Sequence, residues 1–170
     1  TVSVLWSSNA LAKSAMEKKT EKALIQAIEG RTALPDEAVI TVRNLRPSDP
    51  ALFRRAKILT SLVLPAGETG TGTVTAQVRI KTSRKDGSDT MLWVMARIDV
   101  QVPTLVTNHA ISRGTLLSEE DLRTELKPMG RYLVHMDEIV GKSARRSFKE
   151  GEPLSKTMLK APPVVKRGDI

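Results

Sequence analysis

The chain has 170 residues, a net charge of +8 and no cysteine. Its length allows one ordinary domain or two small ones, and the missing cysteines exclude disulfides and cysteine-ligated zinc. No apolar run approaches the roughly 18 residues of a membrane-spanning helix, so we expect no membrane insertion of the mature chain. The basic residues are spread thinly, and two Trp, one Tyr and two Phe are too few for the stacking platform of a single-strand nucleic-acid binder. We therefore expect no nucleic-acid partner.

Residues 1–12 are predicted to be the remnant of a signal peptide. A short apolar patch, from Val2 to Trp6, precedes Ala10 and Ala12, which fit the A-x-A pattern that signal peptidase reads. On this interpretation the basic start of the signal lies upstream of Thr1, the mature chain begins near Lys13, and the protein is exported. A frayed terminus or a short buried strand is the alternative.

A helix is predicted for residues 13–28. Small or apolar residues recur there at intervals of three and four, which is the period of one helix face. Gly30 stands where a left-handed C-terminal cap is expected. The face expected to pack consists of Met16, Thr20, Ala23, Leu24, Ala27 and Ile28, and the opposite face carries Glu17, Lys18, Glu21, Lys22 and Glu29.

The pattern then changes to the period of two that is typical of strands. Strands are predicted for residues 39–45 and 56–64, with Pro47 and Pro50 marking the loop between them. Residues 73–82 alternate most regularly, which places four apolar side chains on one face: Val74, Ala76, Val78 and Ile80.

Residues 91–102 form the next predicted strand, with Leu92, Val94, Ala96, Ile98, Val100 and Val102 on one face. Asp86-Gly87 is a turn signal, so this strand and the preceding one are expected to form a long antiparallel hairpin. The glycine-rich residues 67–75 lead into a strand and lack the G-K-[ST] ending of a phosphate loop, so they are interpreted as a turn. Together these elements predict an α+β N-terminal domain over residues 13–103.

Beyond this point, short apolar pieces are broken by glycine and proline, as is typical of compact domains with many short strands. Ser118 followed by Asp121 predicts a helix N-cap with acids in the first turn. Residues 138–148 predict a short strand on either side of Gly141. The chain is therefore expected to be mostly β overall.

Candidate catalytic groups are few. His109 lies in a polar stretch, and His135 has Asp137 and Glu138 nearby, but a single short cluster is better interpreted as a solvated loop than as a metal or acid–base site. The chain contains no G-x-S-x-G nucleophile elbow. We therefore expect no enzyme activity, no metal and no cofactor.

The densest basic cluster consists of Lys142, Arg145, Arg146 and Lys149. On a strand, Arg145 and Arg146 would point to opposite faces, so that one could meet a partner while the other covers the domain. These four residues are the predicted partner-binding site. The alternative is an ordinary solvated edge that discourages strand-to-strand aggregation.

The second half of the chain resembles the SAF domain, a β-clip module. The matching stretches are I-x-R-G-T-x-L-S-x-E-D-L at residues 111–122, I-V-G-K-S-A-R-R at residues 139–146 and G-E-P-L at residues 151–154. The resemblance implies glycines that turn the chain where short strands cross and a short helix opened by the E-D-L segment. It places a SAF-type β-clip domain at residues 104–163 and the start of a C-terminal β segment at residues 164–170.

The order of these parts resembles the periplasmic chaperone family that assembles the flagellar P-ring. An export signal, an α+β domain, the SAF domain and a following β segment occur in that sequence. The resemblance implies a protein of the periplasm that binds P-ring subunits and helps them assemble around the rod without catalysis.

Two other SAF-containing classes fit less well. An assembly protein of the Flp-type pilus also carries G-E-P-L, but its domain usually follows an N-terminal membrane anchor closely. An enzyme of the sialic acid synthase type would need a catalytic barrel, for which this chain has no room. The pilus protein remains the alternative.

Overall fold

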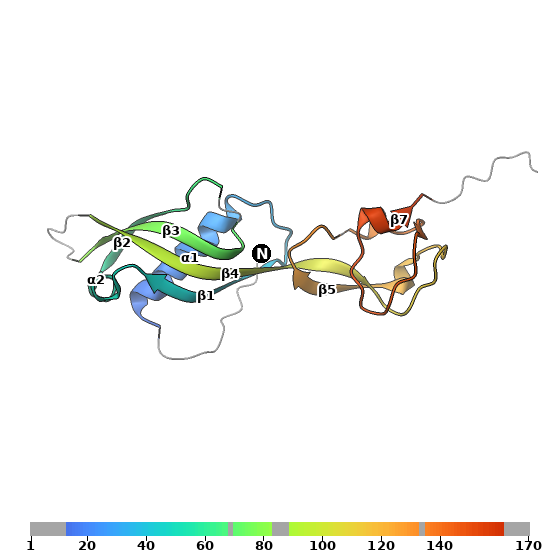
Figure 1. Ribbon diagram of the computed structural model, residues 1–170, viewed down its shortest axis with the longest axis horizontal. Helices are drawn as coiled ribbons and strands as arrows, with labels where there is room; N and C mark the ends of the chain where they lie inside the picture. The colour runs from blue at the N-terminus through green and yellow to red at the C-terminus, as the bar shows by residue number, and fades with distance from the viewer. Residues whose placement is uncertain (1–12, 68–69, 83–88, 133–134, 162–170) are drawn as a thin grey trace, which may run out of the picture. The chain divides into compact units, whose positions relative to one another are not determined.

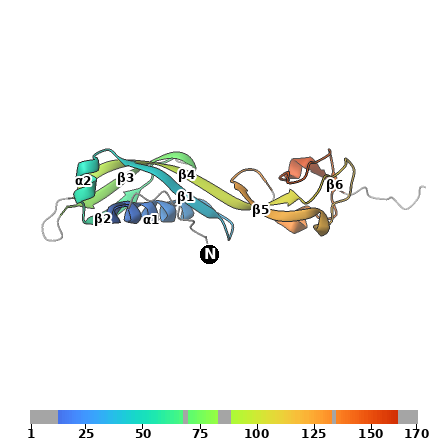
Figure 2. The same ribbon diagram turned by 90° about the horizontal axis from the view of Figure 1, so that it is seen from below.

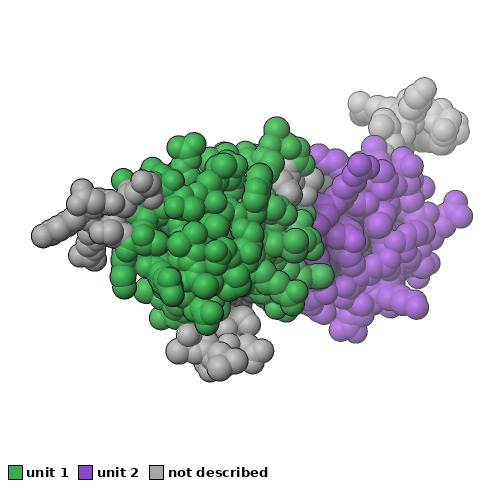
Figure 3. Space-filling model, turned by 60° about the vertical axis from the view of Figure 1, so that its left-hand side comes forward, with its two compact units in different colours: residues 1–100 green, residues 101–170 purple. Residues whose placement is uncertain are grey.

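A computed structural model describes residues 13–67, 70–82, 89–132 and 135–161. Three sequence predictions therefore lie outside the described residues: the signal remnant at 1–12, the turn at Asp86-Gly87 and the β segment at 164–170. The chain divides into two compact units, residues 1–100 and residues 101–170 (Figure 3). Within the described part, no helix is long and apolar enough to cross a membrane.

Unit 1 consists of a sheet with one long helix on one of its faces (Figures 1 and 2). Its elements are α1 (Ala15–Glu29), β1 (Val39–Pro47), α2 (Pro50–Arg55), β2 (Ile58–Val63), β3 (Gly72–Lys81) and the first part of β4 (Thr90–Thr107), whose residues 101–107 belong to unit 2. The strand order is β1-β4-β3-β2, and β3 is antiparallel to both β2 and β4. The chain thus forms the long hairpin that its alternating pattern predicts.

Helix α1 begins with a capping box. The Ser14 side chain accepts a hydrogen bond from the Glu17 N–H, and the Glu17 carboxylate accepts one from the Ser14 N–H. Its buried residues are Met16, Thr20, Glu21, Leu24, Ile25 and Ile28.

The prediction for this helix was wrong at two points. Glu21 was placed on the solvent face, but it is buried and its carboxylate accepts hydrogen bonds from the Lys13 ammonium at 2.9 and 3.1 Å. Gly30 has φ −69° and ψ −17°, which is right-handed, because the turn continues and its N–H still donates to the Gln26 carbonyl.

The inner face of the sheet forms the core of unit 1. Val74, Ala76, Val78 and Ile80 on β3 are fully buried, as predicted, and they lie opposite apolar residues of β4. The residues of β4 that were expected on one face are buried too. However, β4 does not end near residue 102; it continues through Pro103 to Thr107 because extended backbone accommodates the fixed φ of proline.

The short helix α2 was not predicted from the sequence, because its residues were assigned to the loop between two strands. Asp49 caps it by accepting from the Leu52 N–H at 2.9 Å, Pro50 occupies its first turn, and Phe53 is buried in the core. Strand β2 therefore begins at Ile58, since the Ala56 N–H still donates to the Leu52 carbonyl.

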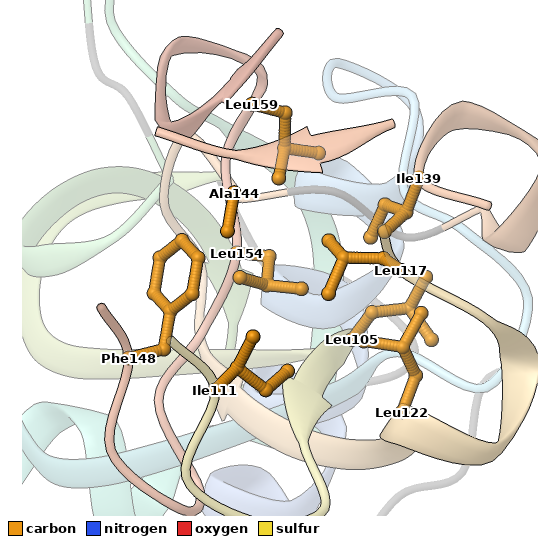
Figure 4. Packing of buried hydrophobic residues seen from close by; sticks show 9 residues of the cluster. All are labelled: Leu105, Ile111, Leu117, Leu122, Ile139, Ala144, Phe148, Leu154 and Leu159. Atoms are coloured by element: carbon orange, nitrogen blue, oxygen red, sulfur yellow. The ribbon is translucent and has the colours of Figure 1, made fainter. Parts of the chain in front are cut away.

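Unit 2 is built from short elements around its own apolar core. Strand β5 (Leu122–Pro128) pairs antiparallel with residues 101–107 of β4, and β6 (Ser143–Ala144) pairs with β7 (Leu159–Lys160). Single 3-10 turns lie at Glu119–Asp121, Met136–Glu138 and Lys156–Met158. Figure 4 shows the core side chains gathered together: Leu105, Ile111, Leu117, Leu122, Ile139, Ala144, Phe148, Leu154 and Leu159.

The described chain is therefore mostly β, with an antiparallel sheet and few helices, as expected. The strand expected before Gly141 does not form in the described residues 135–140. The N–H groups of Ile139 and Val140 both donate to the Met136 carbonyl at 3.0 Å, which closes a turn instead.

Candidate partner-binding surface

The motif at residues 111–122 and the segment at residues 139–148 lie side by side in unit 2. Ile111 bridges Phe148, and Leu116 bridges Ser143. The Gly141 N–H donates to the Leu117 carbonyl, and the Leu117 N–H donates to the Lys142 carbonyl, each at 2.9 Å. Gly141 has φ +79°, so the chain can turn there without the strain that a Cβ would cause.

The G-E-P-L stretch is hydrogen-bonded to the end of β4. Gly151 has φ +72° and donates its N–H to the Thr107 carbonyl at 2.8 Å. Pro153 bridges Val106, and Leu154 is fully buried. This motif therefore forms a turn and part of the apolar core of unit 2.

Glu152 is the polar centre of this turn. Its carboxylate pairs with the Arg146 guanidinium at 2.5 Å and accepts the Lys149 N–H at 2.9 Å. The Arg146 hydrogen bond, followed by the Lys149 N–H, holds the pKa of Glu152 below its ordinary value. Arg146 also lies 4.8 Å from the centre of the Phe148 ring, within the range of a cation–π contact.

The structure places the four predicted partner-binding residues in two settings. Arg146 and Lys149 meet at Glu152, whereas Arg145 and Lys142 do not join them there. Arg145 and Arg146 do not point to opposite faces of a strand as predicted, because β6 ends at Ala144 and the chain bends. Both arginines are exposed, as is Lys149, and Lys142 is half-buried.

Two exposed apolar residues accompany Lys142 and were not singled out from the sequence. Leu116 is 56% exposed and Val140 is 38% exposed, and the hydrogen bonds between Leu117 and residues 141 and 142 bring their segments together. The sequence held only a partial signal: neighbouring residues of an extended segment point to opposite sides, so one of the adjacent Leu116 and Leu117 had to point outward. Leu116 and Val140 thus add exposed apolar side chains to the paired segments that carry Lys142.

The two histidines occupy separate positions. His109 is exposed and its Nε2 lies 2.9 Å from Asp121 Oδ1. The hydrogen bond between His109 Nδ1 and the Ala110 carbonyl raises the pKa of His109, and the Asp121 carboxylate raises it further. Near His135, Glu138 pairs with Lys156 at 2.7 Å. Among the residues that the structure describes, no group of three His, Asp or Glu side chains is arranged to hold a metal ion.

The family comparison concerns unit 2. Residues 102–170 match the family model described as "Chaperone for flagella basal body P-ring formation". These residues include all three motif stretches and the four basic residues. No curated protein sequence matches the chain.

Solved structures give the fold of a larger part of the chain. Flagellar protein FlgA from Thermotoga maritima is 21% identical, with a TM-score of 0.55, over 89% of this chain and 55% of that one. Salmonella FlgA in its open form is 17% identical, with a TM-score of 0.47, over 85% of this chain and 63% of that one. The chain therefore spans about half the length of the Thermotoga protein whose fold it shares. Residues 102–170 thus match the model of the family of chaperones for flagella basal body P-ring formation, and the Thermotoga structure shows the fold alone.

Proposed function

We propose that the chain is a periplasmic chaperone that binds the flagellar P-ring subunit and assists its assembly around the rod. The observation that carries this proposal is the family match over residues 102–170, whose motif residues build the turns and core of unit 2. The family is one of chaperones, which agrees with a role in binding and not in catalysis. The pilus alternative is not favoured, because the matching model describes a flagellar chaperone.

The finer architecture is part of the same proposal. Residues 13–103 form an α+β domain, residues 104–163 form a SAF-type β-clip domain, and residues 1–12 and 164–170 belong to a signal remnant and a further β segment. The positive-φ glycines at crossings of short segments support the β-clip assignment. Export by the signal remnant would bring the protein to the compartment of its partner.

The basic residues of unit 2 are the proposed contact with the ring subunit. Within the described part of the chain, the side chains of Lys142, Arg145 and Lys149 form no ion pair, so their charge is available to a partner. Arg146 differs from them, because it is already bound by Glu152 and Phe148. Exposed cations of this kind increase the rate of association with an acidic surface.

The binding of the purified full chain to purified ring subunit tests this proposal. The double substitution Arg145→Glu and Lys149→Glu is expected to weaken binding about tenfold, mainly through a slower association rate that depends on salt. Its matched control is Lys18→Glu with Lys22→Glu, which makes the same charge change on exposed residues of α1.

Biolayer interferometry at low and physiological salt separates the outcomes. Binding by the unaltered chain that only the first double substitution weakens supports both the function and the basic contact. Equal weakening by both double substitutions would show that the effect comes from the net charge of the chain, and the proposed basic contact in unit 2 would be wrong. If the unaltered chain does not bind the ring subunit, the proposed function is wrong.

A further inference from the structure

The outward face of the unit 1 sheet carries large apolar side chains. Along β4, the residues that alternate with the buried ones include Met91, Trp93 and Met95, which are 52, 46 and 49% exposed. Helix α1 covers the opposite face of the sheet (Figure 2). In an antiparallel sheet with one solvated face, polar residues are expected at such positions.

The strand register joins these side chains into one surface. Trp93 lies opposite Gln77 of β3, and Gln77 lies opposite Val63 of β2, which is 53% exposed. Directly opposed residues of an antiparallel pair point to the same face. We use the name outer sheet face for these apolar residues and three neighbouring arginines: Val63, Met91, Trp93, Met95, Arg43, Arg79 and Arg97.

Arginines border the apolar residues. Arg79 lies opposite Met91, and Arg97 follows Met95 on the same side of β4. Arg43 and Arg97 share a single carboxylate, that of Asp99, at 3.5 and 3.6 Å. The border thus has an excess of positive charge that a partner with carboxylates would complement.

Folding does not explain this combination. A Trp and two Met held on a solvated face add nothing to the core, whereas exposed apolar groups with a polar border mark interaction surfaces. Trp and Arg are the residue types that contribute most to binding at protein interfaces, and Met adapts to irregular partner surfaces. Gln77, between Trp93 and Val63, would lose its hydrogen bonds in lipid but can form them with a protein partner.

We infer that the outer sheet face is a second docking surface of the chaperone, and that it takes a segment of the ring subunit in which apolar side chains alternate with or flank carboxylates. This inference rests on the proposed function, since it names the same partner. It assigns unit 1 a direct part in binding, separate from the basic residues of unit 2.

The effect of Trp93 on affinity is the first test. Trp93→Ala in the full chain is expected to weaken binding to purified ring subunit at least tenfold, as for a central interface tryptophan, and Trp93→Phe by much less. Arg79→Glu should weaken binding, whereas Lys22→Glu on α1 should not. The thermal midpoint and circular dichroism spectrum of each variant show whether the fold is retained.

A spectroscopic measurement on the unsubstituted chain makes the test independent of variant stability. The chain has two tryptophans, Trp6 and Trp93. In protein labelled with 5-fluorotryptophan, the fluorine resonance of Trp93 is assigned by its loss in Trp93→Phe. Unlabelled ring subunit is expected to shift or broaden that resonance.

The outcomes distinguish this inference from the proposed function. If the full chain binds the ring subunit while Trp93→Ala and Arg79→Glu leave affinity unchanged and the Trp93 resonance does not move, the inference is overturned and the function stands. If the full chain does not bind, both fail. If Trp93 is needed for sedimentation with phosphatidylglycerol vesicles and not for subunit binding, the surface is a membrane contact and the inference is wrong.

Discussion

Glu152 illustrates how one carboxylate can hold a turn together. It receives the Arg146 guanidinium and the Lys149 N–H, while its own N–H donates to the Thr107 hydroxyl at 3.2 Å. The Thr107 N–H in turn donates to the Glu152 carbonyl at 3.1 Å. The loop that carries the predicted basic residues is thus fixed to the end of β4 by this residue.

Replacing this carboxylate by an amide should reduce stability in a pH-dependent way. The pKa of Glu152 is lowered from 4.5, first by Arg146, so the folded state favours the ionised form. Its contribution is complete above the unfolded pKa and is lost as the pH falls through the lower, folded pKa. Glu152→Gln is therefore expected to cost about 1 kcal/mol near pH 7, and this cost should shrink as the pH falls below the ordinary carboxyl range, as measured by urea unfolding.

Glu150 provides the matched control for this prediction. Its side chain is 68% exposed and lies 3.7 Å from Arg123. Glu150→Gln should change the free energy of unfolding by less than about 0.5 kcal/mol both near pH 7 and in acid. Equal losses for the two variants, or a Glu152→Gln loss that persists in acid, would contradict the assigned role of Glu152.

At the scale of elements, regular alternation was predictable and helix ends were not. The inward residues of β3 and β4 follow directly from a period of two, because each must face the one core that α1 covers. Helix α2 has only six residues, too few for a periodic signal, and depends on the Asp49 cap and the burial of Phe53. A proline was interpreted as part of a loop although it also favours the first turn of a helix.

Two glycines that follow helical turns differ in backbone conformation, so the same Gly→Ala substitution should affect stability differently at each. Gly30 and Gly141 each follow a helical turn, but Gly30 has φ −69° and Gly141 has φ +79°. Gly141→Ala is expected to cost about 1–2 kcal/mol, since nothing crowds the new Cβ and the loss is purely conformational. Gly30→Ala should be neutral or stabilise by up to about 1 kcal/mol.

Chemical unfolding of the two variants checks this pair. The Cβ at position 30 would lie 3.4 Å from the Gln26 carbonyl oxygen, an ordinary contact, so steric cost does not confuse the comparison. A destabilised Gly30→Ala together with an unaffected Gly141→Ala would contradict the backbone conformations described for these two positions.

At the scale of the whole molecule, the sequence predicts the class of protein through its motifs, whereas the residues that bind a partner stay a prediction. The motif stretches are recognisable because they build turns and core, where only a few residue types fit. Surface roles depend on tertiary neighbours: the sequence does not distinguish Arg146 from Arg145, whereas the structure places Glu152 and Phe148 beside Arg146. Trp93 is not distinguished by the sequence pattern, because a period of two identifies the inward residues of β4 and leaves the role of the outward ones open.

The central claim is that this chain assists P-ring formation. Electron microscopy of basal bodies purified from cells that lack the chain tests it most directly, with the full-length protein restored from a plasmid as the comparison. The account predicts basal bodies in which the P-ring is missing or much reduced, and its recovery when the chain is restored. Basal bodies with a normal complement of P-rings in the absence of the chain would contradict it.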